Sequence, residues 1–228
     1  ILAAENATMN RRPLGVGIIN LAYWLAKNDT NYTNPNLKLV DEYAEAWSYY
    51  LIKASANLAV EKGACPKNDE TLYGDGIMPA ETSAQISNST NGIEPPRSYV
   101  SVKQSKDGVL KQVVPGYPRL KNKYELLWDQ KSPEGYLKIM AVLQKYIDQG
   151  ISANTSYNPQ FFEDEKIPMS VMLKDVIMCY KYGMKQLYYF NTFDGSGDDY
   201  DNELSNELNL TQDQEQEIID ESCDSCAI

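Results

Sequence analysis

The stretch SPEGYLKIMAVLQKYIDQGISANTSY, residues 132–157, decides the fold class, because its pattern changes from helical to extended. Ser132 and Pro133 suit the start of a helix, where a hydroxyl caps free N–H groups and proline lacks an N–H to satisfy. Apolar residues then recur three and four positions apart, as on the buried face of a helix. We expect the helix to end near Gly150 and a strand to follow over 151–157.

The same order returns further along the chain. Residues 168–182 predict an amphipathic helix that Gly183 ends, and KQLYYFN at 185–191 predicts a short strand. Helices that alternate with short strands after residue 130 favour an α/β fold. No linker is evident before residue 193, so we expect one domain over 1–193 and a tail over 194–228.

The first half of the chain is predicted to be mainly helical, with one hairpin. Helices are expected over 15–27 and 37–62, and Gly63 supplies the stop of the second. Two runs rich in valine flank an Asp-Gly turn within 99–114, which indicates a β-hairpin. A short helix is expected over 120–128.

Composition excludes several kinds of chemistry. The 228 residues are 43% hydrophobic, enough for a sizeable core, but no apolar run approaches the ~20 residues of a membrane span. The sequence contains no histidine, which excludes Ser-His-Asp and Cys-His pairs and imidazole metal sites. Chemistry must therefore use thiols, carboxylates, tyrosines, lysines or backbone amides.

The distribution of charge and the N-terminal residues support further predictions. The formal net charge is −11, and the segment 194–228 holds seven Asp and five Glu without a basic residue. The nearly neutral remainder argues against nucleic acid as a partner, and the acidic segment is predicted to be a disordered, solvated tail. The chain begins with Ile1 and not with Met, so we expect a processed or excised beginning. Its first residues form neither a basic leader nor a secretory stretch, and four thiols without a signal peptide suggest a reducing, cytoplasmic compartment.

Cys223 and Cys226 form a Cys-X-X-Cys pair close to the end of the chain. This spacing lets two thiols close a small disulfide, which suits dithiol exchange. The alternative is half of a zinc site, but zinc needs four ligands and Cys65 and Cys179 are isolated in the sequence. The neighbouring Asp224 disfavours the thiolate, so the pair is typical of a mobile carrier of reducing equivalents.

Two other motifs are weaker when taken alone. Tyr188 and Tyr189 lie in a predicted buried strand, where they read as core aromatics. Neighbouring side chains of a regular strand point to opposite faces, so use as a stacked pair would need a distorted backbone. The segment Pro79–Ser83 offers backbone N–H groups and two good N-cap residues, Thr82 and Ser83, and a helix N-terminus can bind a phosphate. This segment lies near the start of a polar stretch over residues 78–96. The stretch is either an ordinary surface loop or a functional loop, since long loops inside a compact domain are usually functional.

Together these segments resemble the C-terminal part of the large, catalytic subunit of class I ribonucleoside-diphosphate reductase. The resemblance covers nearly the whole chain and is carried, in order, by RRPLGVGIINLAYWLAK (11–27), PAETSAQISNSTNGIEPPR (79–97), VSVKQSKDGVLKQVVP (100–115), DQGISANTSYNP (148–159), LYYFNT (187–192) and the terminal cysteine pair.

The resemblance implies a fold and an activity. Residues 1–193 would be the C-terminal part of a ten-stranded α/β barrel, and the full subunit would reduce ribonucleoside diphosphates with a thiyl radical. A metal-containing small subunit would generate the radical, so no metal is expected in this chain. Thioredoxin or glutaredoxin would be the external reductant.

The resemblance also implies roles for particular residues. Tyr188 and Tyr189 match the radical relay, and Cys223 and Cys226 match the tail thiols that re-reduce the active site. In the family these two thiols are often further apart. The implied substrate-binding residues are Pro79, Ala80, Glu81, Thr82, Ser83 and Arg97, with Ala80 standing where the family often has serine.

Two departures from the family pattern matter. The radical-carrying cysteine, the Asn and Glu beside it, the redox-active cysteine pair and the effector regions have no match here, so we expect a separate N-terminal polypeptide to supply them or the chain to be a fragment. Between Tyr73 and Met78 the family usually has several tens more residues, including the strand that leads to the phosphate loop. Two other classes stay open: a non-catalytic interaction fragment and a thiol-redox adaptor.

Overall fold

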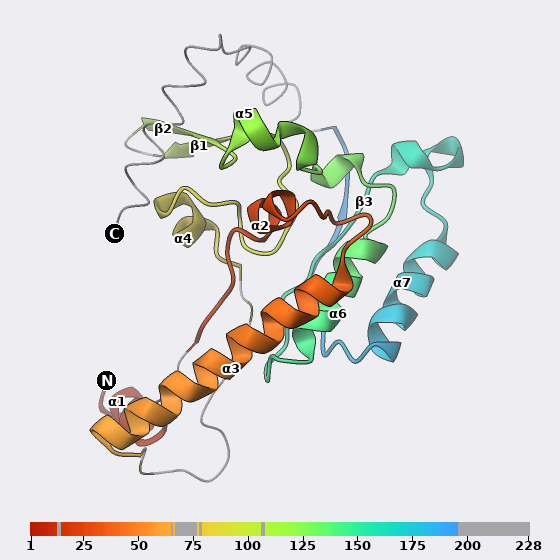
Figure 1. Ribbon diagram of the computed structural model, residues 1–228. Coiled ribbons are helices and arrows are strands. Elements are labelled where there is room, and N and C mark those ends of the chain that lie inside the picture. Colours follow the sequence, from red (N-terminus) through yellow and green to blue (C-terminus); the bar gives the residue numbers. More distant parts are fainter. Residues whose placement is uncertain (13–14, 65, 67–76, 78, 106–107, 196–228) are drawn as a thin grey trace.

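The computed structural model (Figure 1) describes residues 1–12, 15–64, 66, 77, 79–105 and 108–195. Of the tail expected over 194–228, only Asp194 and Gly195 lie within the described residues. The helices and strands are, in order, α1 (Leu2–Arg11), α2 (Leu21–Lys27), α3 (Leu37–Lys62), α4 (Glu81–Ile86), β1 (Val100–Ser105), β2 (Gly108–Val113), α5 (Tyr117–Leu120), α6 (Glu134–Gln144), β3 (Thr155–Tyr157), α7 (Met169–Lys181) and β4 (Phe190–Thr192). Single 3-10 turns cover Lys121–Lys123, Leu127–Asp129, Pro159–Phe161 and Glu163–Glu165.

Helix α6 forms the centre of the hydrophobic core and begins where its sequence predicts, although it ends at Gln144 and not near Gly150. Eight of its eleven residues are buried, and α2, the start of α3 and α7 pack around it (Figure 1). Ser132 Oγ accepts a hydrogen bond from the Glu134 N–H at 3.1 Å, which satisfies one of the free amides at the helix start. Near this end Gly135 lies directly against the backbone of Tyr32, so only glycine fits.

The predicted α/β unit is confirmed, although its strands are shorter than expected. Strands β3 and β4 pair in parallel, Thr155 opposite Phe190, and α7 lies between them in the chain. Regular pairing starts only at Thr155 because the preceding residues use other partners. Ser152 N–H bonds to the Ile77 carbonyl, and the Asn154 side chain accepts the Tyr189 N–H.

The hairpin is also confirmed. Strands β1 and β2 are antiparallel, in a register that runs from Val100–Val113 to Ser105–Gly108. The turn residues between them, including Asp107, lie outside the described residues. The hairpin joins the body through Val100 and Val114, which are buried.

Helix α3 has the predicted bounds, with Gly63 at its end in a left-handed conformation (φ 81°). Its packing differs from the prediction, because only Val40 and Ala44 are buried. The second half of α3 extends away from the body (Figure 1), so Ala54 and Leu58 are exposed although they lie in the predicted pattern of apolar residues three and four positions apart.

Two predicted helices are corrected. The helix expected over 15–27 begins only at Leu21, because Asn20 adopts a left-handed conformation and its N–H bonds to the Thr90 carbonyl. The helix expected over 120–128 is replaced by α5 and two 3-10 turns. Its last part is pulled out of helical geometry because the Leu127 N–H bonds to the Pro96 carbonyl. No helix in the described part of the chain is both long and apolar enough to cross a bilayer.

The close approach at Gly135 gives a stability prediction. A Cβ at this position would lie 1.8 Å from the Tyr32 carbonyl oxygen, so the backbone must move. We expect Gly135→Ala to lower the free energy of unfolding by about 3 kcal/mol, measured by urea denaturation. Gly17→Ala is the control, since a Cβ there meets nothing within 4 Å; equal losses in the two variants would contradict the assignment.

Candidate functional site

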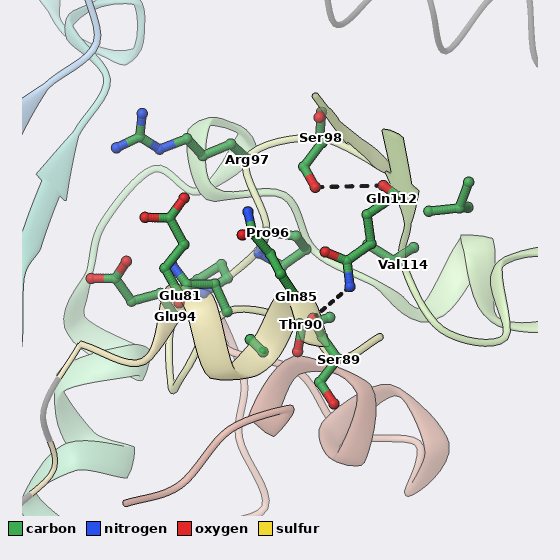
Figure 2. A pocket seen from close by; sticks show the side chains of 15 residues that line it. Glu81, Gln85, Ser89, Thr90, Glu94, Pro96, Arg97, Ser98, Gln112 and Val114 are labelled. Carbon is green, nitrogen blue, oxygen red and sulfur yellow. Dashed lines mark hydrogen bonds between the residues drawn. The ribbon is translucent and has the colours of Figure 1, made fainter. Parts of the chain in front are cut away.

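A cavity of about 410 Å³ opens between α4, the loop over residues 89–98 and the β1–β2 hairpin (Figure 2). Its wall mixes carboxylates, amides, hydroxyls, an arginine and prolines, contributed by Glu81, Ala84, Gln85, Ser89, Thr90, Asn91, Glu94, Pro95, Pro96, Arg97, Ser98, Ser101, Gln112, Val113 and Val114. The cavity is therefore polar and open enough for a charged small molecule.

The loop that forms the cavity wall is tied to its neighbours from two sides. Asn20 Oδ1 accepts hydrogen bonds from the Thr90 N–H at 3.0 Å and the Thr90 hydroxyl at 3.3 Å. On the hairpin side, Gln112 Nε2 donates to Asn88 Oδ1 at 3.2 Å and to the Ser89 carbonyl at 3.3 Å. These bonds fix the wall before any ligand arrives, which lowers the entropic cost of binding.

The structure brings only two of the predicted substrate-binding residues to this cavity. Glu81 and Arg97 line it, whereas Pro79, Ala80, Thr82 and Ser83 do not. The prediction that Thr82 and Ser83 cap a helix is wrong: α4 starts at Glu81 with Ala80 as its N-cap, and both hydroxyl residues lie within the helix and are exposed. Alanine has no side-chain oxygen, so no side chain caps this end.

Glu94 is a wall residue that the sequence reasoning missed. Burial raises the pKa of its carboxyl, and the hydrogen bond from Asn154 and the charge of Arg97 lower it in part. It also lines a second cavity of about 10 Å³ with Pro95, Leu127, Gln130, Pro133, Tyr136, Asn154 and Ser156. The only sequence signal was its place inside the motif that ends at Arg97.

The two rings of the tyrosine pair are in contact, although they are tilted and not stacked in parallel. The rings of Tyr188 and Tyr189 have centroids 4.0 Å apart and planes inclined at 46°. Both residues precede β4 and are exposed, at 47% and 56%, so the interpretation as core aromatics is wrong. Hydrogen bonding to Tyr189 raises the pKa of the Tyr188 phenol.

The backbone of the pair is held against the segment before β3. Tyr188 N–H donates to the Ala153 carbonyl and Thr155 N–H donates to the Tyr189 carbonyl, both at 2.8 Å. Tyr189 N–H donates to Asn154 Oδ1 at 3.0 Å. The Asn154 side chain thus replaces a backbone carbonyl as the acceptor for the Tyr189 N–H. This irregular pairing lets the rings of Tyr188 and Tyr189 lie on the same side, whereas neighbouring side chains of a regular strand alternate.

Cys179 lies in a buried polar cluster rather than in a redox site. The Tyr157 hydroxyl donates to Asp175 Oδ2 at 3.0 Å, and burial raises the pKa of the Asp175 carboxyl. Burial, with the Asp175 charge, raises the pKa of the Cys179 thiol to about 11. Cys65, Cys223 and Cys226 lie outside the described residues. Within the described ranges, no group of three His, Cys, Asp or Glu side chains could hold a metal ion.

Comparison with known proteins identifies the class. A sequence model of the family described as "Ribonucleotide reductase, barrel domain" matches residues 1–78 and 76–190, so the chain belongs to this family. The described residues accordingly show the helices and strands of one part of an α/β barrel. The two matched segments overlap at residues 76–78, next to the place where several tens of residues of the family are expected to be missing.

Particular relatives are bacterial and viral. The chain is 47% identical over 241 residues to the ribonucleoside-diphosphate reductase subunit alpha of Haemophilus influenzae, covering 87% of this chain and 32% of that protein. It is 45% identical over 244 residues to the ribonucleoside-diphosphate reductase 1 subunit alpha of Escherichia coli, covering 88% of this chain and 32% of that protein. For the alpha subunit of Enterobacteria phage T4 the identity is 41% over 243 residues, with 87% and 32% covered. The chain therefore spans about a third of the length of these curated relatives.

A solved structure supports the fold. The alpha subunit of the Actinobacillus ureae class Id ribonucleotide reductase superposes with a TM-score of 0.63 at 19% identity, covering 83% of this chain and 40% of that one. At this identity the likeness concerns the fold alone. It agrees with the prediction of an α/β barrel portion.

The stacked phenols give a titration prediction. Tyr189→Phe removes the hydroxyl that hydrogen bonds to Tyr188, so the pKa of Tyr188 should fall toward 10, the ordinary value of tyrosine. Carbon-13 NMR of labelled tyrosine measures this in the intact chain. Tyr180→Phe, at an exposed position on α7, should leave the pKa of Tyr188 unchanged. An unaltered Tyr188 titration in Tyr189→Phe would show that the two phenols do not interact.

The Cys179 cluster gives a reactivity prediction. Because the thiolate is the reactive species and burial disfavours it, Cys179 should resist iodoacetamide at pH 8 in the folded chain. Peptide mass spectrometry should show labelling of Cys179 only after unfolding in urea. Rapid labelling in the folded chain would contradict its burial.

Proposed function

We propose that this chain is the C-terminal part of the large subunit of a class I ribonucleoside-diphosphate reductase, which converts ribonucleoside diphosphates to deoxyribonucleoside diphosphates for DNA synthesis. The observation that carries the proposal is the contact between the Tyr188 and Tyr189 rings at 4.0 Å. Phenols in contact can pass an oxidising equivalent: one loses an electron and a proton, and the neighbouring phenoxyl regains both. The relatives are named as alpha subunits of this reductase.

The cavity supports the substrate side of the proposal. Arg97 on its wall offers a planar cation that can bind two phosphate oxygens at once. The segment Pro79–Ser83 precedes and begins α4 beside it, and Ala80 keeps its backbone N–H although it lacks a hydroxyl. We assign the diphosphate to this end of the cavity.

The remaining parts of the reaction come from elsewhere. We propose that a separate N-terminal polypeptide supplies the radical-carrying cysteine, and that a metal-containing small subunit generates the radical. Cys223 and Cys226 would pass two electrons and two protons to the active-site disulfide, and thioredoxin or glutaredoxin in the cytoplasm would reduce the tail in turn.

The relay role of Tyr188 can be tested by removing one oxygen. Tyr188→Phe keeps the ring but cannot form a phenoxyl radical, so turnover of cytidine diphosphate by the assembled enzyme should fall to background. Disulfide exchange between the tail and thioredoxin should be unchanged. The control is Tyr180→Phe on α7, which should keep full turnover, and turnover that survives Tyr188→Phe would remove this residue from the relay.

A second candidate is a non-catalytic interaction fragment, which the exposed apolar side chains along the second half of α3 favour. Both candidates include binding to an N-terminal large-subunit polypeptide, and only the enzyme adds turnover to it. Co-purification followed by a diphosphate reductase assay separates them. Binding without added turnover supports the fragment, and absence of both excludes the enzyme.

A further inference from the structure

Glu94 belongs to the walls of two cavities. It lines the larger cavity together with Arg97 and the smaller one together with Asn154. Figure 2 shows Glu81 and Glu94 on the side of the larger cavity toward Arg97. The carboxylate of Glu94 is therefore shared between the surface where an anion would bind and the interior behind it.

The Asn154 side chain is used at both ends. Its Nδ2 donates to Glu94 Oε1 at 2.5 Å, and its Oδ1 accepts from the Tyr189 N–H at 3.0 Å. An amide has one donor end and one acceptor end, so a single orientation satisfies both contacts. The two hydrogen bonds consequently reinforce each other's geometry.

This amide reaches the tyrosine pair at its least regular point. The Tyr189 N–H, just before β4, donates to the Asn154 side chain, and at this point the two tyrosine rings are in contact. The path from the cavity to the pair is short: Arg97 acts on Glu94 by charge, and two hydrogen bonds lead through Asn154 to Tyr189. Tyr32 and Tyr136 are the buried phenols close enough to feel the Glu94 charge.

We propose that Glu94 and Asn154 are positioning residues that hold the substrate cavity and the Tyr188–Tyr189 pair in one hydrogen-bonded unit, an inference that rests on the proposed reductase function. Glu94 fixes the amide of Asn154, and Asn154 fixes the backbone that keeps the two phenols stacked. An anion bound beside Arg97 then lies at a set position relative to the relay.

The chain offers a reversal test. Asn154→Asp still accepts from the Tyr189 N–H but sets a carboxylate against Glu94, and facing carboxylates repel at neutral pH. We expect kcat of the assembled enzyme for cytidine diphosphate to fall about tenfold or more, with KM changed less than about threefold. Adding Glu94→Gln rebuilds the hydrogen bond in reverse, since the Gln amide donates to the Asp carboxylate. The double variant should return to within about threefold of the wild-type kcat.

Asn191→Ala is the matched control. It removes a side-chain amide that joins the same two strands, through Ser156 Oγ at 3.5 Å, without touching the path to Glu94. It should keep kcat within about twofold of wild type. A loss in Asn191→Ala equal to that in Asn154→Asp, or no recovery in the double variant, would overturn the proposal, because general loosening of the strands would then explain the result.

Hydrogen exchange separates this inference from the proposed function. In the full chain alone, Glu94→Ala should speed exchange of the Tyr189 amide at least about fivefold, although Glu94 does not contact that amide, and Asn191→Ala should have less than a twofold effect. Unchanged exchange of the Tyr189 amide in Glu94→Ala would contradict the proposed link from Glu94 through Asn154 to Tyr189. If the wild-type assembly has no reductase turnover, the proposed function fails. The exchange result alone then decides whether Glu94 and Asn154 position the tyrosine pair.

Discussion

The geometry of the tyrosine pair depends on one constraint. The segment that leads into β3 pairs with the segment that leads into β4, and the pairing continues along the two strands. Two backbone hydrogen bonds of 2.8 Å, and one that the Tyr189 N–H donates to the Asn154 side chain, hold Tyr188 and Tyr189 where a regular strand would have separated their rings. A parallel pair needs a crossover, and α7 provides it while packing against α6. The geometry of the tyrosine pair thus depends on the same α/β unit that builds the core.

The loop over residues 89–98 joins the two candidate sites. Most of its residues line the larger cavity, while Glu94 also accepts a hydrogen bond from Asn154 next to the strand pair. The loop is tied to Asn20 on one side and to Gln112 on the other, so its position is set by segments far apart in the sequence. Such anchoring explains how polar residues on an irregular stretch can hold a defined geometry.

Much of the exposed apolar surface becomes understandable from the family. The second half of α3 leaves the body with tyrosines and a valine exposed, and the chain spans about a third of the length of its relatives. Exposed apolar side chains that lie close together often mark interaction surfaces.

The sequence by itself determined the order of the main elements and the family. The bounds of α3, the starts of α6 and α7 and the two strands of the hairpin follow from local periodicity, capping residues and turn chemistry, which act between residues close in the chain. It also supplied the motifs by which Tyr188, Tyr189 and Arg97 could be selected, because these motifs are contiguous.

Only the tertiary structure decided which of these residues meet. It showed that Glu81 and Arg97 share a cavity that Thr82 and Ser83 do not reach, and that Asn154 takes a place in the strand ladder. It exposed the two phenols that a strand pattern had predicted to be buried. The physical reason is that hydrogen bonds between distant segments, such as Asn154 with Glu94, can outweigh local backbone preference and leave no periodic trace in the sequence.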